Sequence, residues 1–130
     1  MTKDSAPLGS TLNRVRFLGS AKSGTADAWA MRVTSALLVP LSIAFVAIVV
    51  SFFGKDRAGV RAELGHPLIA ILVLFFIVTA VFHMKVGMQS IIDDYVHDSH
   101  LKEWSLIANL VFCAGIGLAC IYAMLKLGFA

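Results

Sequence analysis

Residues 67–100 read PLIAILVLFFIVTAVFHMKVGMQSIIDDYVHDSH, and the architecture follows from this stretch. Its first part, Pro67–Met84, carries no charged residue and is long enough to cross the hydrocarbon core of a bilayer as a helix. An ionisable ring, His83, stands at the end of that apolar run, and an Asp-Asp-Tyr cluster follows at residues 93–95. Burying an ionisable group inside a membrane costs free energy, and such groups are usually functional. His83 is therefore a candidate functional residue.

Two further charge-free runs, Val33–Phe53 and Ser105–Leu125, are also about as long as the ~20 residues that a membrane span requires. Of the 130 residues, 58% are hydrophobic and 15% are charged, whereas soluble domains carry about 25% charged residues. A bilayer offers the backbone no hydrogen-bond partners, so each run is expected to be a helix. Pro40 is expected to kink the first one. The sequence therefore predicts an all-α membrane protein with three transmembrane helices, at about residues 30–53, 67–95 and 104–126.

Basic residues predict the orientation. We expect residues 1–29 to form an irregular cytoplasmic arm and residues 30–130 to form a three-helix membrane anchor. The predicted inner side carries seven basic residues: Lys3, Arg14, Arg16, Lys22, Arg32, Lys85 and Lys102. The predicted outer side carries four: Lys55, Arg57, Arg61 and Lys126. The positive-inside rule thus places the N-terminus inside and the C-terminus outside.

The arm favours a bacterial inner membrane over a mitochondrial one, because it is short and mixed in composition. The net charge of +3 reflects the topology and predicts no nucleic-acid partner.

The third apolar run contains residues suited to helix packing. Cys113 and Cys120 lie too far apart along one helix for a disulfide and are interpreted as small packing residues. Gly115 and Gly117 predict a close approach to another helix, and Asn109 can bond across helices.

His83 is the one histidine placed deep in the predicted bilayer. The others are expected at its surface: His66, His97 and His100. A deep histidine either serves as a ligand or bonds a neighbouring helix. Gly87 follows one turn later on the same face, where a missing side chain would leave room for a flat macrocycle. Its alternative role is ordinary small-residue packing between helices.

The acidic cluster continues this face. Asp94 lies about three turns beyond His83, about 16 Å nearer the predicted inner surface. Asp93, Asp94 and Tyr95 could simply be a polar helix end with an interfacial tyrosine. However, two acids at a helix C-terminus oppose its macrodipole, so another use is expected. Arg32 can offset their charge, or it can serve only as a positive-inside anchor.

The spacing of His83, Gly87 and Asp94-Tyr95, the segment MRVTSALLVPLSI at residues 31–43 and the three-helix layout together resemble a known family. This family is the small hydrophobic membrane anchor of succinate dehydrogenase, known as the cytochrome b556 small anchor. The resemblance covers most of the chain after the arm. It implies a subunit, non-catalytic alone, of succinate:ubiquinone oxidoreductase (complex II), which joins the tricarboxylic acid cycle to respiratory electron transport.

The resemblance also implies roles for single residues. His83 matches the axial ligand of haem b, with Gly87 beside it. Tyr95 matches a tyrosine that hydrogen-bonds a carbonyl of ubiquinone, and Asp94 matches the acid next to it. Arg32 matches an arginine near the haem propionates and the quinone pocket.

Partners are implied as well. A six-coordinate haem b needs two axial ligands, so the second is expected from the companion chain, the large anchor of cytochrome b556. The iron–sulfur and flavoprotein subunits must be separate chains, because this sequence has no cluster or flavin motif. Asp93 receives no role. Two alternatives stay open: the anchor of a fumarate reductase, and a small transporter in which His83 or Asp94 relays protons.

Overall fold

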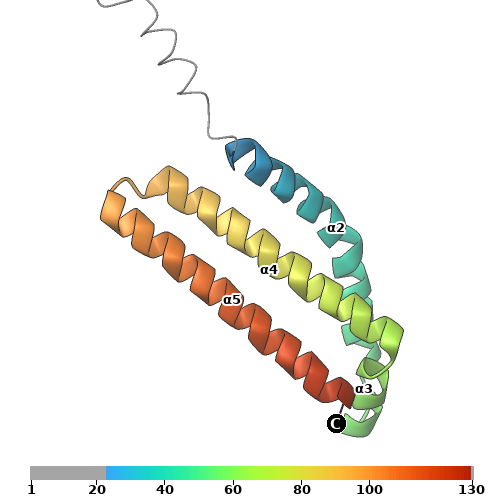
Figure 1. Ribbon diagram of the computed structural model, residues 1–130. Coiled ribbons are helices and arrows are strands. Elements are labelled where there is room, and N and C mark those ends of the chain that lie inside the picture. The colour runs from blue at the N-terminus through green and yellow to red at the C-terminus, as the bar shows by residue number, and fades with distance from the viewer. Residues whose placement is uncertain (1–22, 130) are drawn as a thin grey trace, which may run out of the picture.

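The computed structural model describes residues 23–129, and nearly all of them are helical. Figure 1 shows three long helices and one short one: α2 (Ser23–Ser51), α3 (Arg57–Leu64), α4 (Pro67–Tyr95) and α5 (Ser99–Phe129). Each long helix contains a span apolar enough to cross a membrane, with mean hydropathies of 2.5, 2.5 and 2.1. The described part of the chain has no β-strand. The predicted all-α membrane fold with three candidate transmembrane helices is therefore confirmed.

α4 is the central helix (Figure 1). It packs against α2 and α5, which make no close contact with each other within residues 23–129. The neighbours run antiparallel: Phe45 of α2 stacks on Phe76 of α4 with ring centroids 4.4 Å apart, and Thr34 meets His83 further along. α2 continues through Pro40 and curves along its length. The three helices thus form an open layer, which exposes broad faces to lipid or to other chains.

Few side chains of the described residues are buried. The buried ones are Val73, Val86, Ile92 and Cys113, together with the polar Thr34, Thr79 and Asn109. Large apolar side chains are mostly exposed, including Ile43 (69%) and Leu118 (70%). Water would make such a surface unfavourable, whereas lipid tails cover it without cost. Polar contacts between helices therefore become the specific interactions of this fold.

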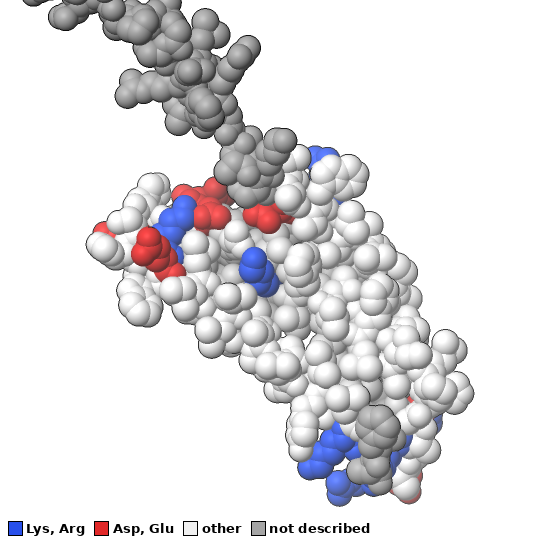
Figure 2. Space-filling view, viewed as in Figure 1, with Lys and Arg blue, Asp and Glu red and all other residues white. Residues whose placement is uncertain are grey.

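Charged side chains gather at the two ends of the helices, with a broad uncharged band between them (Figure 2). At the end formed by the start of α2 and the α4–α5 turn, the described acidic residues are Asp27, Asp93, Asp94, Asp98 and Glu103. The other end, formed by α3 and the end of α5, carries Lys55, Arg57, Arg61 and Lys126. We call these the α4–α5 end and the α3 end.

The charge bias that predicts the orientation depends on the N-terminal arm. Within the described residues, three basic side chains lie toward the α4–α5 end (Arg32, Lys85 and Lys102), against four at the α3 end. The remaining four basic residues of the predicted inner side, Lys3, Arg14, Arg16 and Lys22, lie outside the described residues. The orientation therefore stays a prediction.

The connection between α2 and α4 contains a helix that the hydrophobic pattern does not predict. Gly54 turns the chain with φ 80°, a left-handed conformation that glycine adopts without strain. Asp56 then caps α3, because its carboxylate accepts a hydrogen bond of 2.8 Å from the backbone N–H of Gly59. Local turn and capping chemistry thus forms α3, although its sequence is too short and too polar to read as a span.

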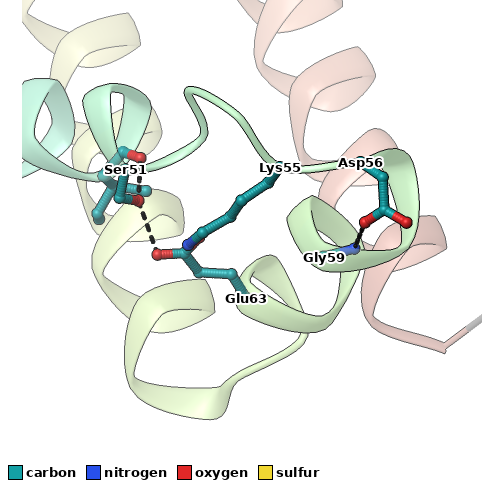
Figure 3. Close-up of polar contacts among 6 residues, drawn as sticks. Ser51, Lys55, Asp56, Gly59 and Glu63 are labelled. Atoms are coloured by element: carbon teal, nitrogen blue, oxygen red, sulfur yellow. Dashed lines mark hydrogen bonds and ion pairs between the residues drawn. The ribbon is translucent and has the colours of Figure 1, made fainter.

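α3 is tied to the end of α2 through Glu63 (Figure 3). Lys55 pairs with one oxygen of its carboxylate, and the Ser51 hydroxyl donates to the other at 2.7 Å. The lysine, and then the hydroxyl, hold the pKa of this carboxyl below its ordinary value of 4.5. Because the pKa of Glu63 is lowered, this contact stabilises the fold fully above about pH 4.5. The stabilisation is lost as the pH falls through the lowered pKa of Glu63.

The long helices differ in how well their limits follow the hydrophobic pattern. α4 spans Pro67–Tyr95 as expected, with its proline at the first helical position. α2 begins at Ser23, inside the segment expected to be an irregular arm. α5 begins at Ser99, about five residues before the expected start, because the Asp98 side chain accepts a 2.8 Å hydrogen bond from the backbone N–H of Leu101.

The α4–α5 contact includes a polar link within the apolar span. Asn109 donates through Nδ2 to the backbone carbonyl of Lys85 at 2.9 Å, which confirms the expected bond across helices. The Cys113 thiol donates to the Asn109 Oδ1 at 3.4 Å. Cys113 and Cys120 are both free thiols, in agreement with their interpretation as packing residues.

The two glycines of α5 are not equivalent. A Cβ at Gly117 would lie 3.4 Å from Val81 of α4, so this glycine belongs to the close helix contact. A Cβ at Gly115 would meet nothing within 4 Å among the described residues. Within residues 23–129 the predicted close approach is seen at Gly117, and for Gly115 it stays a prediction.

Candidate functional site

His83 lies on the side of α4 that meets α2, within the apolar span. Its Nδ1 is 2.8 Å from the Oγ1 of Thr34, and that hydroxyl is also 2.7 Å from the carbonyl oxygen of Ala30, one turn earlier. The ring is partly buried, and its Nε2 has no hydrogen bond within residues 23–129. The helix-to-helix bond that was the alternative to a ligand role is thus present, but it uses only one of the two ring nitrogens.

The second nitrogen suits a single axial position on a haem iron. A neutral imidazole binds iron through one nitrogen while the other makes a supporting hydrogen bond. No group of three or more His, Cys, Asp and Glu side chains among the described residues could hold a metal ion by itself. One such nitrogen can serve as a single ligand of a haem iron whose other ligand comes from elsewhere.

Gly87 lies one turn beyond His83 and faces the same helix. A Cβ at this position would lie 3.6 Å from the terminal methyl of Met31, which is ordinary van der Waals contact with the flexible end of a side chain. The described packing would therefore accept alanine at this position. The neighbour of Gly87 in the described chain is thus Met31, as the alternative of ordinary packing between helices expects, and the clearance for a macrocycle stays a prediction.

The three polar residues that end α4 have different surroundings. Lys102 of α5 pairs with the Asp93 carboxylate at 2.8 Å and donates to the Asp93 backbone carbonyl at 3.3 Å. This lysine offsets the unfavourable interaction of the acid with the helix macrodipole, so Asp93 joins α4 to α5. Asp94 and Tyr95 have no side-chain hydrogen bond or ion pair within the described residues, and Tyr95 is 78% exposed.

Arg32 is not brought next to the acids in this chain. It lies two residues before Thr34, about 200° around α2, and its exposed side chain has no ion pair among residues 23–129. Another contact joins α2 to α4 in this region: Gln89 donates to Asp27 at 3.5 Å and accepts from Lys85 at 2.7 Å. Lys102, rather than Arg32, therefore supplies the positive charge beside the first acid.

A hollow of about 560 Å³ lies between α4 and α5, on the opposite side of α4 from Thr34. Its walls include Val81, Phe82, Cys113 and Gly117, and Lys85 is its one charged residue. Neither His83 nor Tyr95 lines it. A largely apolar hollow of this kind is suited to lipid tails or to apolar side chains of another chain.

Comparison with known proteins gives the family. The family model described as "Succinate dehydrogenase/Fumarate reductase transmembrane subunit" matches residues 6–121. The chain belongs to this family. The succinate dehydrogenase hydrophobic membrane anchor subunit of Paracoccus denitrificans is 30% identical over 111 residues, which cover 85% of each chain. The protein of that name from Rickettsia bellii is 30% identical over 76% of this chain and 79% of its own. No solved structure is significantly similar to the chain.

Family membership confirms the predicted resemblance and the general function that it implied. The chain is a membrane anchor subunit of the succinate dehydrogenase type, and it associates with the other subunits of such a complex. Its bacterial relatives and its three apolar helices together make it a multi-pass protein of the bacterial inner membrane.

Proposed function

We propose that this anchor subunit holds one side of a haem b through His83 Nε2 and forms part of a ubiquinone-reduction site beside Tyr95. The observation that carries the proposal is the position of His83: it lies inside an apolar span, and its Nδ1 is bonded to α2 while its Nε2 has no partner in the described chain. The contact with α2 thus uses one ring nitrogen and leaves the other without a described partner, as a ligand role requires.

A haem b, when bound, supplies a one-electron carrier within the membrane. In this chain His83 would ligate the iron from one side, and Gly87 would leave space beside the ring. Arg32 lies toward the α4–α5 end and is exposed. From this position its guanidinium would face the haem propionates or the quinone pocket. Since one chain offers one deep histidine, the second ligand would come from the companion large anchor of cytochrome b556.

The quinone would lie at the α4–α5 end, with its isoprenoid tail among lipids. The Tyr95 hydroxyl would donate a hydrogen bond to a quinone carbonyl oxygen, and this bond strengthens as that oxygen gains negative charge. Asp94 would act on the same site through its charge. Tyr95 is largely exposed in this chain, so other subunits must complete the pocket and exclude water from it.

The soluble part of the complex would dock at the same end. An iron–sulfur subunit would deliver electrons to the quinone there, and a flavoprotein subunit would oxidise succinate. The family includes fumarate reductase subunits, whereas the curated relatives are named as succinate dehydrogenase anchors. We therefore propose succinate oxidation with ubiquinone reduction as the physiological direction.

A difference spectrum tests the haem assignment. Membranes that contain this chain with its companion subunits should show a reduced-minus-oxidised α-band of a low-spin b-type haem. Membranes that contain the companions without this chain are the control, since half of the ligand set would then be missing. A proton-coupled transporter would show no such band, and its absence from an assembled complex would overturn the proposal.

Cysteine labelling tests the orientation. Ala62→Cys on α3 should react with a membrane-impermeant thiol reagent added to intact spheroplasts, whereas Ser99→Cys should react only after the membrane is opened. Both positions are exposed, and Ala62 avoids Gly59, where a Cβ would lie 3.1 Å from the Asp56 carboxylate. Cys113 and Cys120 are first replaced by alanine to remove the native thiols. The reverse pattern would place Tyr95 on the side away from a cytoplasmic head.

A further inference from the structure

Thr34 has an unusual position on α2. It is the one buried residue of this helix among residues 24–51, with 8% of its surface exposed. The other residues of α2 are partly or largely exposed, as suits a helix at the edge of an open layer. The most buried side chain of α2 is therefore the one whose hydroxyl group contacts the ring of His83.

The geometry around this hydroxyl determines which ring nitrogen carries the proton. Thr34 Oγ1 lies 2.7 Å from the Ala30 carbonyl oxygen and 2.8 Å from His83 Nδ1. A carbonyl can only accept, and two oxygens this close repel each other unless a hydrogen lies between them. We therefore assign the single hydroxyl hydrogen to Ala30, whose carbonyl oxygen is closer than that of Met31 at 3.2 Å. The lone pairs of Thr34 are then left to accept a hydrogen bond from Nδ1–H of His83.

We propose that Thr34 is a positioning residue that fixes His83 as the Nδ1–H tautomer and so keeps Nε2 deprotonated and turned away from α2 as a ready iron ligand. This inference rests on the proposed haem function and extends it to a residue that does not touch the haem. The chain of bonds runs from His83 N–H to the Thr34 hydroxyl and on to the Ala30 carbonyl.

Two physical effects follow from such a chain of bonds. The ring cannot rotate freely about its χ2 angle without losing this partly buried hydrogen bond, so Nε2 is held in one direction. Donation from Nδ1–H also makes Nε2 a stronger electron donor, which strengthens its bond to iron and favours the ferric state. Loss of the acceptor should therefore weaken haem binding and raise the midpoint potential.

Replacing Thr34 by valine tests the proposal, because valine keeps the shape and removes the hydroxyl. In the purified complex, we expect Thr34→Val to weaken haem retention by roughly ten- to a hundredfold, the usual effect of losing an outer-shell partner of a metal ligand, and to shift the haem potential upward. Thr34→Ser retains the hydroxyl and should restore both properties. Thr79→Val is the matched control, since Thr79 is also buried (6%) but makes no hydrogen bond to His83.

Nitrogen NMR of the histidine-labelled full chain, without haem, gives an independent measurement. The proposal requires a protonated Nδ1 and a deprotonated Nε2 at His83 in the native chain, and loss of this preference in Thr34→Val. A protonated Nε2 in the native chain would overturn the inference. So would a Thr34→Val complex with unchanged haem retention and potential.

The proposed function fails under a different result. If His83→Ala retains the native haem spectrum, then His83 is not the ligand and the haem assignment itself is wrong. If His83→Ala loses the haem while Thr34→Val behaves as the native protein, only the inference about Thr34 fails.

Discussion

His83→Ala is expected to abolish the native low-spin haem b spectrum of the assembled complex while the three helices still insert into the membrane. The physical reason is that no other described histidine lies deep within an apolar span: His66 directly precedes α4, His97 lies between α4 and α5, and His100 lies in the first turn of α5. Alanine removes the ligand and leaves the apolar surface of α4 in place. The measurement is a reduced-minus-oxidised spectrum, together with the amount of chain in the membrane fraction.

Single alanine substitutions at His66 and His100 are the matched controls, because both side chains are exposed and neither makes a hydrogen bond among the described residues. Both variants should retain the haem spectrum in full. His97 is a less clean control, since its Nδ1 donates to the backbone carbonyl of Tyr95 at 3.1 Å. A His83 variant with an unchanged α-band would place the ligand elsewhere and contradict the assignment.

The hydrophobic pattern predicted the three candidate membrane-spanning helices well, because membrane spans depend on length and apolar character alone. It placed α4 correctly, since Pro67 and the polar cluster mark both ends of that helix. It could not place the start of α5, which depends on one side-chain cap by Asp98. It also gave no signal for α3, whose Glu63 is held by Lys55 and Ser51 only once the chain has turned back.

The candidate site was predictable in part for a related reason. A histidine in an apolar run stands out by itself, whereas Thr34 is a common kind of residue in a transmembrane helix. Its bond to His83 joins residues 49 positions apart, so it depends on the antiparallel register of α2 against α4. Met31 beside Gly87 and Phe45 on Phe76 follow the same register. A short loop between the first two spans would set the register of α2 against α4 and so bring these residues together. Because α3 lengthens that connection, the register could not be derived in this way.

Asp93 shows the limit of arguments from one helix at a time. Two adjacent acids at the end of α4 oppose its macrodipole, which suggests a shared functional use. The structure separates them, because Lys102 of the next helix pairs with Asp93 and not with Asp94. The acid that keeps an unpaired carboxylate among the described residues is therefore the one beside Tyr95, where a charge could act on a quinone.

Tyr95→Phe is expected to lower the rate of quinone reduction by roughly ten- to a hundredfold. Phenylalanine keeps the ring at the end of α4 and removes only the hydroxyl donor. A hydrogen bond to an oxygen that gains negative charge contributes about 1.5–3 kcal/mol, and ~1.4 kcal/mol corresponds to a factor of ten. The measurement is succinate-dependent reduction of a soluble ubiquinone analogue by the purified complex.

Two comparisons make the Tyr95 result specific. Succinate oxidation with an artificial acceptor that bypasses the quinone should be nearly unchanged, because the flavin and iron–sulfur centres belong to other chains. Tyr122→Phe is the matched variant: Tyr122 is also exposed (67%), but it lies toward the far end of α5, and its loss should leave both assays unchanged. Equal losses in the two assays for Tyr95→Phe would indicate failed assembly of the complex. If Tyr95→Phe leaves the rate of quinone reduction unchanged, then Tyr95 is only an interfacial anchor, because the hydroxyl is the only group that the substitution removes.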